Sequence, residues 1–528
     1  MWGARTKTFG LTYCAVKCDP HLCNSSRLSV ERAPLRLHVL QWQACEPASS
    51  PATSPEPLDI PPGSFRLAVK DNIATADLPT TCASDILSNH VSPYDANIVR
   101  QLKARGAVVV GKTNLDEFGM GSHSTNSVFG AVHNTGALAG HSAGGSSGGS
   151  AVAVRSGAAQ IGLGTDTGGS IRLPAAYTGT VGYKPSYGMI SRFGVVPYAN
   201  SLDTVGFLAR EVQPIWELVN EKRLYAEHDP KDPTSLSDAA RRRCTKAREY
   251  YVPEGAAAKT VPGDHILGSM TFGIPLEYNI EELDPRIRAA WTRIGERLQE
   301  LGARVVPVSL PSTRHALSAY YVIAPAEASS NLAKYDGVRY GKRSEASDGA
   351  GEVLYSETRG AGFGEEVKRR ILLGSYTLSS EAMDNYFIQA QKVRQLVRRD
   401  FDRVFALANP LHDEEHFDLS EMDDSVLLEN KFGPTQVDFL LCPTAPTLPP
   451  TLEAVLDQTP LDAYMNDVFT VPASLAGLPA LSLPMKLTPD SKGTSNGEDV
   501  AGLQLIGQYW DDARLLAVAE LLRKPLDT

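Results

Sequence analysis

The sequence predicts an α/β fold, in which helices and buried strands alternate along the chain. A short apolar run, FRLAVK at 65–70, has the composition of a buried strand. An apolar helical stripe after residue 95 leads into the strand-like run AVVVGK at 107–112, and a second stripe after residue 284 leads into RVVPVSL at 304–310. A helix followed by a buried strand is typical of sheets covered by helices. No repeat of fixed period interrupts this pattern.

Each predicted element has residues that start or end it. A polar pair follows FRLAVK, so this strand delivers Lys70 to the edge of a sheet. Asp95 is placed to cap the helix that carries the first stripe, and Gly106 is placed to end it. The second helix is bounded in the same way, by the opening pair Asp284 and Pro285 and by the closing Gly302.

The chain divides into a tail, a linker and one folded unit. The first 40 residues carry six Lys or Arg against two acidic residues, a balance typical of an organelle transit peptide, with a basic disordered tail as the alternative. We therefore interpret 1–45 as an N-terminal tail with a mitochondrial address. Residues 46–63 are rich in Pro and Ser and predict an extended linker. The folded domain then runs over 64–524.

Within that domain, residues 225–263 are polar and broken by Pro, which indicates a surface excursion. The cluster RRRC at 241–244 inside it is interpreted as a solvated face. The chain contains seven Cys, and their spacing matches no paired zinc pattern, so we expect unpaired thiols, no bound metal and an intracellular protein. The seven are Cys14, Cys18, Cys23, Cys45, Cys82, Cys244 and Cys442.

Composition limits the class of protein. The 528 residues suffice for one large domain or two ordinary ones, and 42% of them are hydrophobic. No stretch approaches the roughly 20 apolar residues that a membrane-spanning helix needs. The formal net charge of −10 disfavours binding to a phosphate backbone, which requires clustered Lys and Arg. Any nucleic acid should therefore be held mainly by a partner.

Two Gly-Gly-Ser clusters are the most unusual feature of the sequence. SAGGSSGGS occupies 142–150, and GLGTDTGGSIRLPAA occupies 162–176. A flexible linker is disfavoured because apolar segments flank both clusters, and a phosphate-binding loop is disfavoured because neither cluster has the required Lys or glycine spacing. Acyl transfer fits better. Glycines let backbone N–H groups converge on an oxyanion beside an exposed serine, and here those groups belong to Thr167, Gly168, Gly169 and Ser170.

A serine nucleophile needs a base, and the sequence offers two kinds. His123, His133 and His141 are candidates, but none lies at a strand end or in a glycine turn, and surface histidines are as good an interpretation. Lys70 ends an apolar strand. Holding a lysine neutral near pH 7 costs about 4 to 5 kcal/mol, an amount that desolvation in a closed site can supply. Taken by itself, Lys70 could instead be a salt-bridged lysine at the end of a strand. Lys112, at the end of the predicted strand 107–112, is the main competitor of Lys70 for the role of base.

The motifs AVKDNI, GGSSGGSAVAV, GTDTGGSIRLPAA and GYKPSYGMISRFGVVPYANSLDTVG together resemble the amidase signature family. The resemblance implies an α/β/α layered fold with a large central mixed β-sheet covered by helices. It also implies a Ser–cis-Ser–Lys triad, which would consist of Ser170 as nucleophile, Ser146 as bridging serine and Lys70 as base. Lys112 lies in a segment that is structural in the family.

Longer segments, among them HDPKDPTS, GFGEEVKRRILLG and MNDVFTVPASLAGLPALSLP, resemble the glutaminase subunits of tRNA-dependent amidotransferases within that family. This resemblance implies that Arg370 binds the α-carboxylate of glutamine, that Asp467 binds its α-ammonium and that Tyr320 lines the pocket. Without their surrounding motifs, Arg370 would be interpreted as a surface charge and Asp467 as an acidic residue at the start of a helix.

The same resemblance implies a role in a complex. The chain would release ammonia from glutamine for the conversion of Glu-tRNA(Gln) to Gln-tRNA(Gln). A B-type subunit would bind the tRNA and use ATP and Mg²⁺, a small accessory subunit would complete the assembly, and this chain would bind no cofactor itself. Two alternatives stay open at this point: a free-standing amidase acting on another carboxamide, and a catalytically silent assembly subunit.

Overall fold

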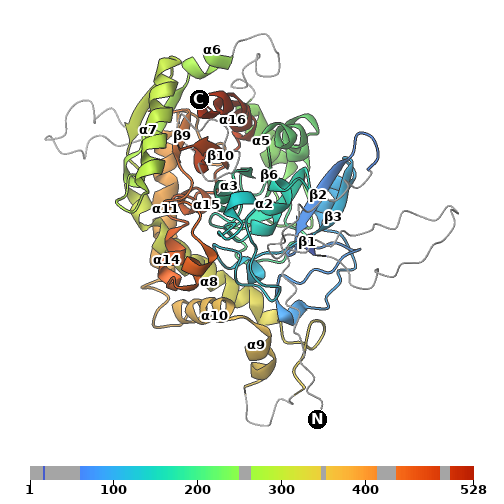
Figure 1. Cartoon of the computed structure of the whole chain (residues 1–528). Helices are drawn as coiled ribbons and strands as arrows, with labels where there is room; N and C mark the ends of the chain where they lie inside the picture. Colours follow the sequence, from blue (N-terminus) through green and yellow to red (C-terminus); the bar gives the residue numbers. More distant parts are fainter. Residues whose placement is uncertain are drawn as a thin grey trace, which may run out of the picture.

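The computed structural model describes residues 16–17, 60–248, 263–345, 353–412, 436–487 and 500–527. Within these ranges the strands form one mixed sheet of eleven strands in the order β1-β3-β2-β4-β6-β5-β10-β11-β9-β7-β8. The sheet with its covering helices confirms the predicted α/β layered fold (Figure 1). The strands are β1 Val16–Lys17, β2 Phe65–Lys70, β3 Ala107–Thr113, β4 Ile161–Asp166, β5 Val181–Lys184, β6 Thr204–Ala209, β7 Thr271–Pro275, β8 Arg304–Val308, β9 Phe439–Pro443, β10 Ala480–Lys486 and β11 Val500–Ile506.

Parallel pairing lies near the two ends of the sheet, although the edge strand β1 pairs with β3 in antiparallel fashion. β2 pairs in parallel with both β3 and β4, and β7 pairs in parallel with β8 and β9. The strands between them, from β4 through β6, β5, β10 and β11 to β9, pair in antiparallel fashion. The two helix–strand alternations of the sequence therefore lie in these parallel parts, because parallel neighbours need a crossover connection.

The helices surround the sheet and enclose one large hydrophobic core (Figure 1). α3 packs on β5, β10 and β11, while α8 packs against α10 and α11. The helices are α1 Asn97–Lys103, α2 Gly148–Arg155, α3 Arg172–Thr178, α4 Gln213–Trp216, α5 Asp238–Arg248, α6 Gly263–Gly268, α7 Pro285–Glu300, α8 Ala316–Asn331, α9 Ser356–Gly362, α10 Glu365–Thr377, α11 Phe387–Val404, α13 Leu452–Leu456, α14 Pro460–Met465, α15 Val471–Leu475 and α16 Asp512–Asp527.

The predicted elements are present, with one error in capping. β2, β3 and β8 match the three predicted strands, and Asp284 caps α7 by accepting the backbone N–H of Arg286 at 2.8 Å. Asp95 does not cap α1. Its carboxylate instead accepts the backbone N–H of Ala76 at 2.8 Å and pairs with Lys103 at 2.7 Å. The acid thus ties the start of the helix to a preceding loop.

Helices α8 and α10 approach each other closely because one residue at their contact is glycine. A Cβ atom on Gly374 would overlap the carbonyl oxygen of Pro325 in α8. Arg370 lies one turn before Gly374 on α10, and its guanidinium carbon lies 5.4 Å from the ring centre of Tyr321 on α8. The close packing of the two helices therefore places this arginine against the tyrosines of α8.

The interpretation of 241–244 as a solvated face is wrong for two of its four residues. Arg241 and Cys244 are buried, while the two arginines between them are exposed. The guanidinium of Arg241 donates to the carbonyl oxygens of Tyr225, Leu236 and Met189. An arginine that satisfies several carbonyls can be buried, which a charge count does not reveal.

Several sequence predictions fall outside the described ranges. Apart from β1, the N-terminal tail and almost all of the linker at 46–63 are not described, and neither are residues 249–262 of the excursion. In the parts of the chain that the structure covers, Cys82, Cys244 and Cys442 are buried, and Cys244 and Cys442 form no disulfide with a described residue. No helix of these parts has the length and hydropathy needed to cross a bilayer.

Candidate active site

Lys70 is the last residue of β2 and is completely buried. Its Nζ lies 2.7 Å from the Oγ of Ser146. The same Nζ lies 3.0 Å from Oγ1 and 3.3 Å from the carbonyl oxygen of Thr165, a residue of the neighbouring strand β4. The peptide bond between Gly145 and Ser146 is cis. The structure therefore brings together two of the three residues that the family resemblance singled out.

Burial lowers the pKa of Lys70 from 10.5 to about 7. The nearby carboxylates of Asp116, Asp166 and Asp203 oppose this shift, but desolvation is the larger effect. The neutral amine fits its surroundings, because its two hydrogens can be donated to the two oxygens of Thr165. Its lone pair then faces the hydroxyl of Ser146 and can accept that proton.

Ser170 lies in the turn that joins β4 to α3, and it is only partly buried. The turn is anchored by Asp166, whose carboxylate pairs with the guanidinium of Arg172 at 2.9 Å with both side chains fully buried. The backbone N–H of Ser147 donates to the carbonyl oxygen of Ser170 at 3.1 Å. The two glycine-rich segments of the sequence are therefore in direct contact.

The segment 167–170 connects β4 to α3. Among the described residues, no acceptor takes the N–H groups of these four positions. The hydroxyl of Thr167 donates to Asp203 at 2.7 Å, which fixes one end of the segment. A Cβ atom on Gly168 would lie 2.7 Å from the ring of Tyr320, and one on Gly169 would lie 2.7 Å from a carboxylate oxygen of Asp467. The two residues must be glycine for these side chains to approach.

Arg370 projects from α10 and is 3% exposed, despite its position in a Lys-Arg-Arg run. Its Nε donates to Glu366 at 2.8 Å, and its Nη1 donates to the hydroxyl of Tyr198 at 2.7 Å. The rings of Tyr198, Tyr321 and Tyr464 lie within 5.6 Å of its guanidinium carbon. These neighbours raise the pKa of Arg370 further above its ordinary value, so the group is a fixed cation.

Asp467 lies against Gly169. Its carboxylate accepts the hydroxyls of Ser122 at 3.0 Å and of Tyr321 at 3.3 Å. Burial raises the pKa of Asp467 to about 6, and Ser122 and Arg370 counteract part of this effect. Tyr320, the predicted pocket residue, is buried and packs edge-on against Tyr321 with 4.9 Å between ring centres. Tyr321 thus contacts both the cation of Arg370 and the carboxylate of Asp467.

Two of the other candidate bases, Lys112 and His123, have structural partners. Lys112 is buried, with its Nζ 2.6 Å from the carbonyl oxygen of Ile73 and 2.9 Å from the hydroxyl of Thr80. His123 contacts the hydroxyl of Ser142 at 2.9 Å, and burial lowers its pKa to about 4. These contacts do not involve Ser170.

Sequence reasoning missed several residues that build the site. Asp116 accepts the backbone N–H groups of Ser124, Thr125 and Asn126, and a Cβ atom on Gly145 would overlap its carboxylate. It therefore supports the loop that presents Ser146. Thr165 lies inside a motif that was recognised, but its contact with Lys70 spans 95 positions. The others contact Arg370 or Asp467, and they are Tyr198, Tyr321, Glu366 and Tyr464.

The sequence matches a known family and known proteins over most of its length. A model of the family described as Amidase matches residues 66–516. The A subunit of the mitochondrial glutamyl-tRNA(Gln) amidotransferase of Fusarium vanettenii is 66% identical over 461 residues, which cover 87% of this chain and 86% of that protein. Its namesake from Podospora anserina is 65% identical, covering 88% of this chain and 90% of that protein.

The fold has solved counterparts. The crystal structure of the glutamyl-tRNA(Gln) amidotransferase A subunit from Thermotoga maritima superimposes with a TM-score of 0.64 and 33% sequence identity, over 90% of this chain and 86% of that one. The match to the family model covers most of the described chain, from β2 to α16. The chain therefore belongs to the amidase family.

Proposed function

We propose that this chain hydrolyses the side-chain amide of glutamine with Ser170 as nucleophile, Ser146 as bridging serine and Lys70 as base. One observation carries the proposal: a fully buried lysine whose pKa is about 7 contacts a serine hydroxyl at 2.7 Å. A charged surface lysine could not accept a proton near neutral pH, whereas this one can.

The proton moves in two short steps. Ser146 gives its hydroxyl proton to Nζ of Lys70 and takes the proton of Ser170, whose oxygen attacks the amide carbon of glutamine. The N–H groups of 167–170 would stabilise the negative oxygen of the tetrahedral intermediate, a contribution of several kcal/mol in enzymes of this kind. Collapse of the intermediate breaks the C–N bond, and the proton returns through Ser146 to the departing ammonia. Water then releases glutamate from the acyl ester at Ser170.

The pocket supports glutamine as the substrate. Its α-carboxylate requires a cation and its α-ammonium requires an anion. Arg370 and Asp467 offer these charges, and both contact Tyr321. The Nη2 group of Arg370 has no acceptor among the residues that the structure covers, so it can be donated to a carboxylate. Tyr320 would close the side of the pocket over Gly168.

The names of the relatives support a place in a complex. Those proteins are A subunits of mitochondrial glutamyl-tRNA(Gln) amidotransferases, so we propose that this chain works in the mitochondrion with partner subunits. A B-type subunit would hold the tRNA and use ATP and Mg²⁺ to activate the glutamyl group, with a small accessory subunit beside it. The acidic net charge of −10 agrees with a chain that supplies ammonia and does not itself hold the tRNA.

Glutamine turnover, measured for the chain alone and with its partners, tests this function. We expect weak turnover alone, stimulation by the partners, and loss of turnover in Ser170→Ala. Full activity without partners would contradict the role in a complex, and normal turnover in Ser170→Ala would contradict the nucleophile. Competition between glutamine and simple aliphatic amides separates glutaminase from a free-standing amidase of other specificity. Inactivity of the intact complex would favour the silent assembly subunit.

A further inference from the structure

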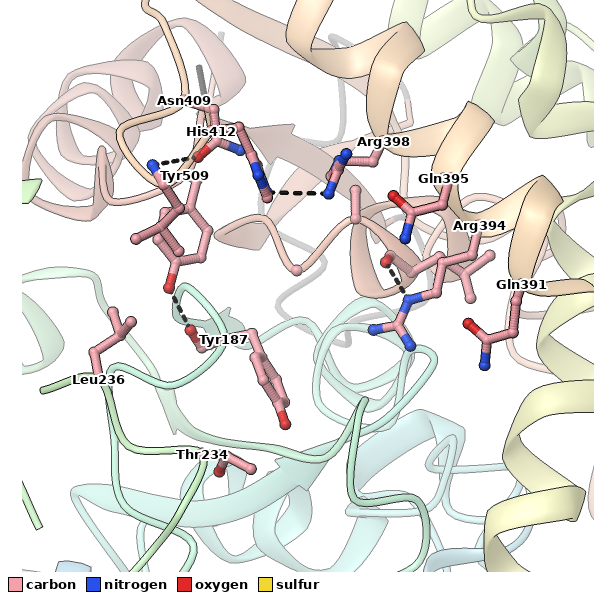
Figure 2. Close-up of a pocket in the computed structure, with 14 residues that line it drawn as sticks. Tyr187, Thr234, Leu236, Gln391, Arg394, Gln395, Arg398, Asn409, His412 and Tyr509 are labelled. Carbon is pink, nitrogen blue, oxygen red and sulfur yellow. Dashed lines mark hydrogen bonds between the residues drawn. The ribbon is translucent and has the colours of Figure 1, made fainter. Parts of the chain in front are cut away.

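A cavity of about 340 Å³ is lined by residues that are all different from those of the site described above (Figure 2). One wall is α11, from which Gln391, Arg394, Gln395 and Arg398 project on one face because they are three or four residues apart. The other walls come from the segment before α5, the loop at 409–412, the end of α15 and the residue pair Tyr187 and Tyr509. The remaining lining residues are Thr234, Leu236, Asn409, Leu411, His412, Leu475, Ala476 and Gly477.

The charge of this cavity is positive. Two arginines and one histidine line it, and none of its lining residues is acidic. Arg394 is held by the wall, since its Nε donates to the carbonyl oxygen of Leu475 at 3.0 Å and its Nη atoms donate to Ser201 at 2.8 Å. It therefore contributes a fixed positive charge to the cavity.

Arg398 is less completely paired. Its Nη1 lies 3.1 Å from Nε2 of His412, and its Nε is buried without a hydrogen bond. The nearest carboxylate, that of Asp402, lies 3.8 Å from Nε and already accepts the amides of Asn409 and Gln508 at 3.1 Å. An anion in the cavity could accept hydrogen bonds from Arg398 without breaking a strong ion pair.

The polar groups restrict the ligand further. An amino acid or an amine would bring an ammonium group, for which the lining offers no carboxylate. The carboxamides of Gln391 and Gln395 make no hydrogen bond with a described residue, and each offers one acceptor and a pair of donors. Glutamine and asparagine carboxamides match the mixed donor and acceptor edges of nucleobases. Figure 2 shows both carboxamides on the same side of the space that the ring of Tyr187 faces.

We propose that this cavity binds a nucleoside monophosphate. Arg398 would hold the phosphate, with Arg394 adding charge, while Gln391 and Gln395 would hydrogen-bond the base. The aromatic and apolar walls would cover the faces of the base and ribose. The volume lies at the lower end of the range for small-molecule sites, roughly 300 to 1,000 Å³, which suits a mononucleotide better than a dinucleotide.

Binding to the full-length chain by calorimetry tests the proposal, with AMP, GMP, CMP and UMP as probes and with adenosine, inorganic phosphate and glutamate as controls. At least one nucleotide should bind, at least tenfold more tightly than adenosine or phosphate, and glutamate should not compete. Arg398→Gln should weaken nucleotide binding at least tenfold while adenosine binding stays unchanged. Gln391→Leu should weaken the binding of both nucleotide and nucleoside.

Arg297→Gln is the matched control, since this arginine is exposed on α7 and pairs with Glu300. It should leave nucleotide binding unchanged, and circular dichroism should show the three variants folded like the parent chain. The proposal is wrong if none of the four nucleotides binds at millimolar concentration. It is equally wrong if binding is the same in Arg398→Gln and Gln391→Leu as in the parent chain, because the ligand would then lie elsewhere.

Discussion

Replacing Lys70 by Met should abolish glutamine turnover and also change how the stability of the fold depends on pH. The lysine is fully buried with a pKa of about 7, compared with 10.5 in an unfolded chain. Each pKa unit corresponds to about 1.4 kcal/mol, so below pH 7 the buried lysine costs the fold about 5 kcal/mol. Methionine fills a similar volume without a titrating group.

The sign follows from the order of the two pKa values. Between about pH 7 and 10.5 the unfolded chain holds a proton that the folded chain has lost, so the stability of the parent chain rises with pH in this range. The Met variant lacks this gain. The loss of the contacts with Ser146 and Thr165 also changes the stability of the variant, but by an amount that does not depend on the ionisation of Lys70. The ionisation of Lys70 is therefore revealed only by how the stability difference between parent and variant changes with pH.

Denaturant unfolding of both proteins between pH 7 and 9 measures this difference. The stability of the Met variant relative to the parent should fall by about 2 to 3 kcal/mol over this range. Lys103→Met removes a partly exposed lysine and is the control for the loss of one positive charge. A difference between parent and Lys70→Met that stays constant over this range would refute a neutral lysine, and with it the proposed base.

Three further predictions concern the proposed site. Ser146→Ala should lower kcat by several orders of magnitude while the affinity for glutamine, measured by equilibrium binding, stays within a few-fold. Arg370→Gln should raise KM for glutamine about 10- to 100-fold, the equivalent of a charge-assisted hydrogen bond of roughly 1.5 to 3 kcal/mol, while turnover of an amide without an α-carboxylate stays unchanged. The KM of the parent chain should rise as the pH falls through about 6, because Asp467 then becomes protonated, whereas the KM of Asp467→Asn should be high at every pH. Steady-state kinetics of both proteins at pH 5.5 and 8 measure this difference. If the KM of the two proteins changed with pH in parallel, this role of Asp467 would be contradicted.

Local patterns in the sequence were sufficient to predict elements that depend only on residues close by in the chain. β2 ends at Lys70 as predicted, because an apolar run stops where a charge begins. Asp284 caps α7 through a contact only two residues along the chain. Asp95 has the same chemistry but does not cap α1, because the N–H of Ala76 and the amine of Lys103 compete for its carboxylate. A cap is predictable only when no partner from elsewhere reaches the residue.

The surroundings of the site depend on contacts that no local pattern specifies. Thr165 meets Lys70 because β4 pairs in parallel with β2, a register that is fixed only once the sheet has formed. Arg370 in its basic run and Arg241 in RRRC both suggested exposed charge, yet both are buried. Tyrosines surround the first and carbonyl oxygens surround the second. The family resemblance singled out Arg370 because it relies on longer motifs, whereas a count of charges treats this residue like its exposed neighbours.

The proposed reaction chemistry and the proposed specificity come from different parts of the chain. Lys70, Ser146 and Ser170 are carried by β2 and by the turns before α2 and α3, whereas Tyr320 and Asp467 come from α8 and from the loop before α15. The two groups meet at 168–169, where glycines leave room for the side chains opposite. Burial lowers the pKa of Lys70, and its hydrogen-bond partners Ser146 and Thr165 belong to the same part of the chain, so substitutions at Tyr320 should change the accepted amide without disturbing the base. A change in substrate that also moved the pH dependence of kcat would contradict this separation.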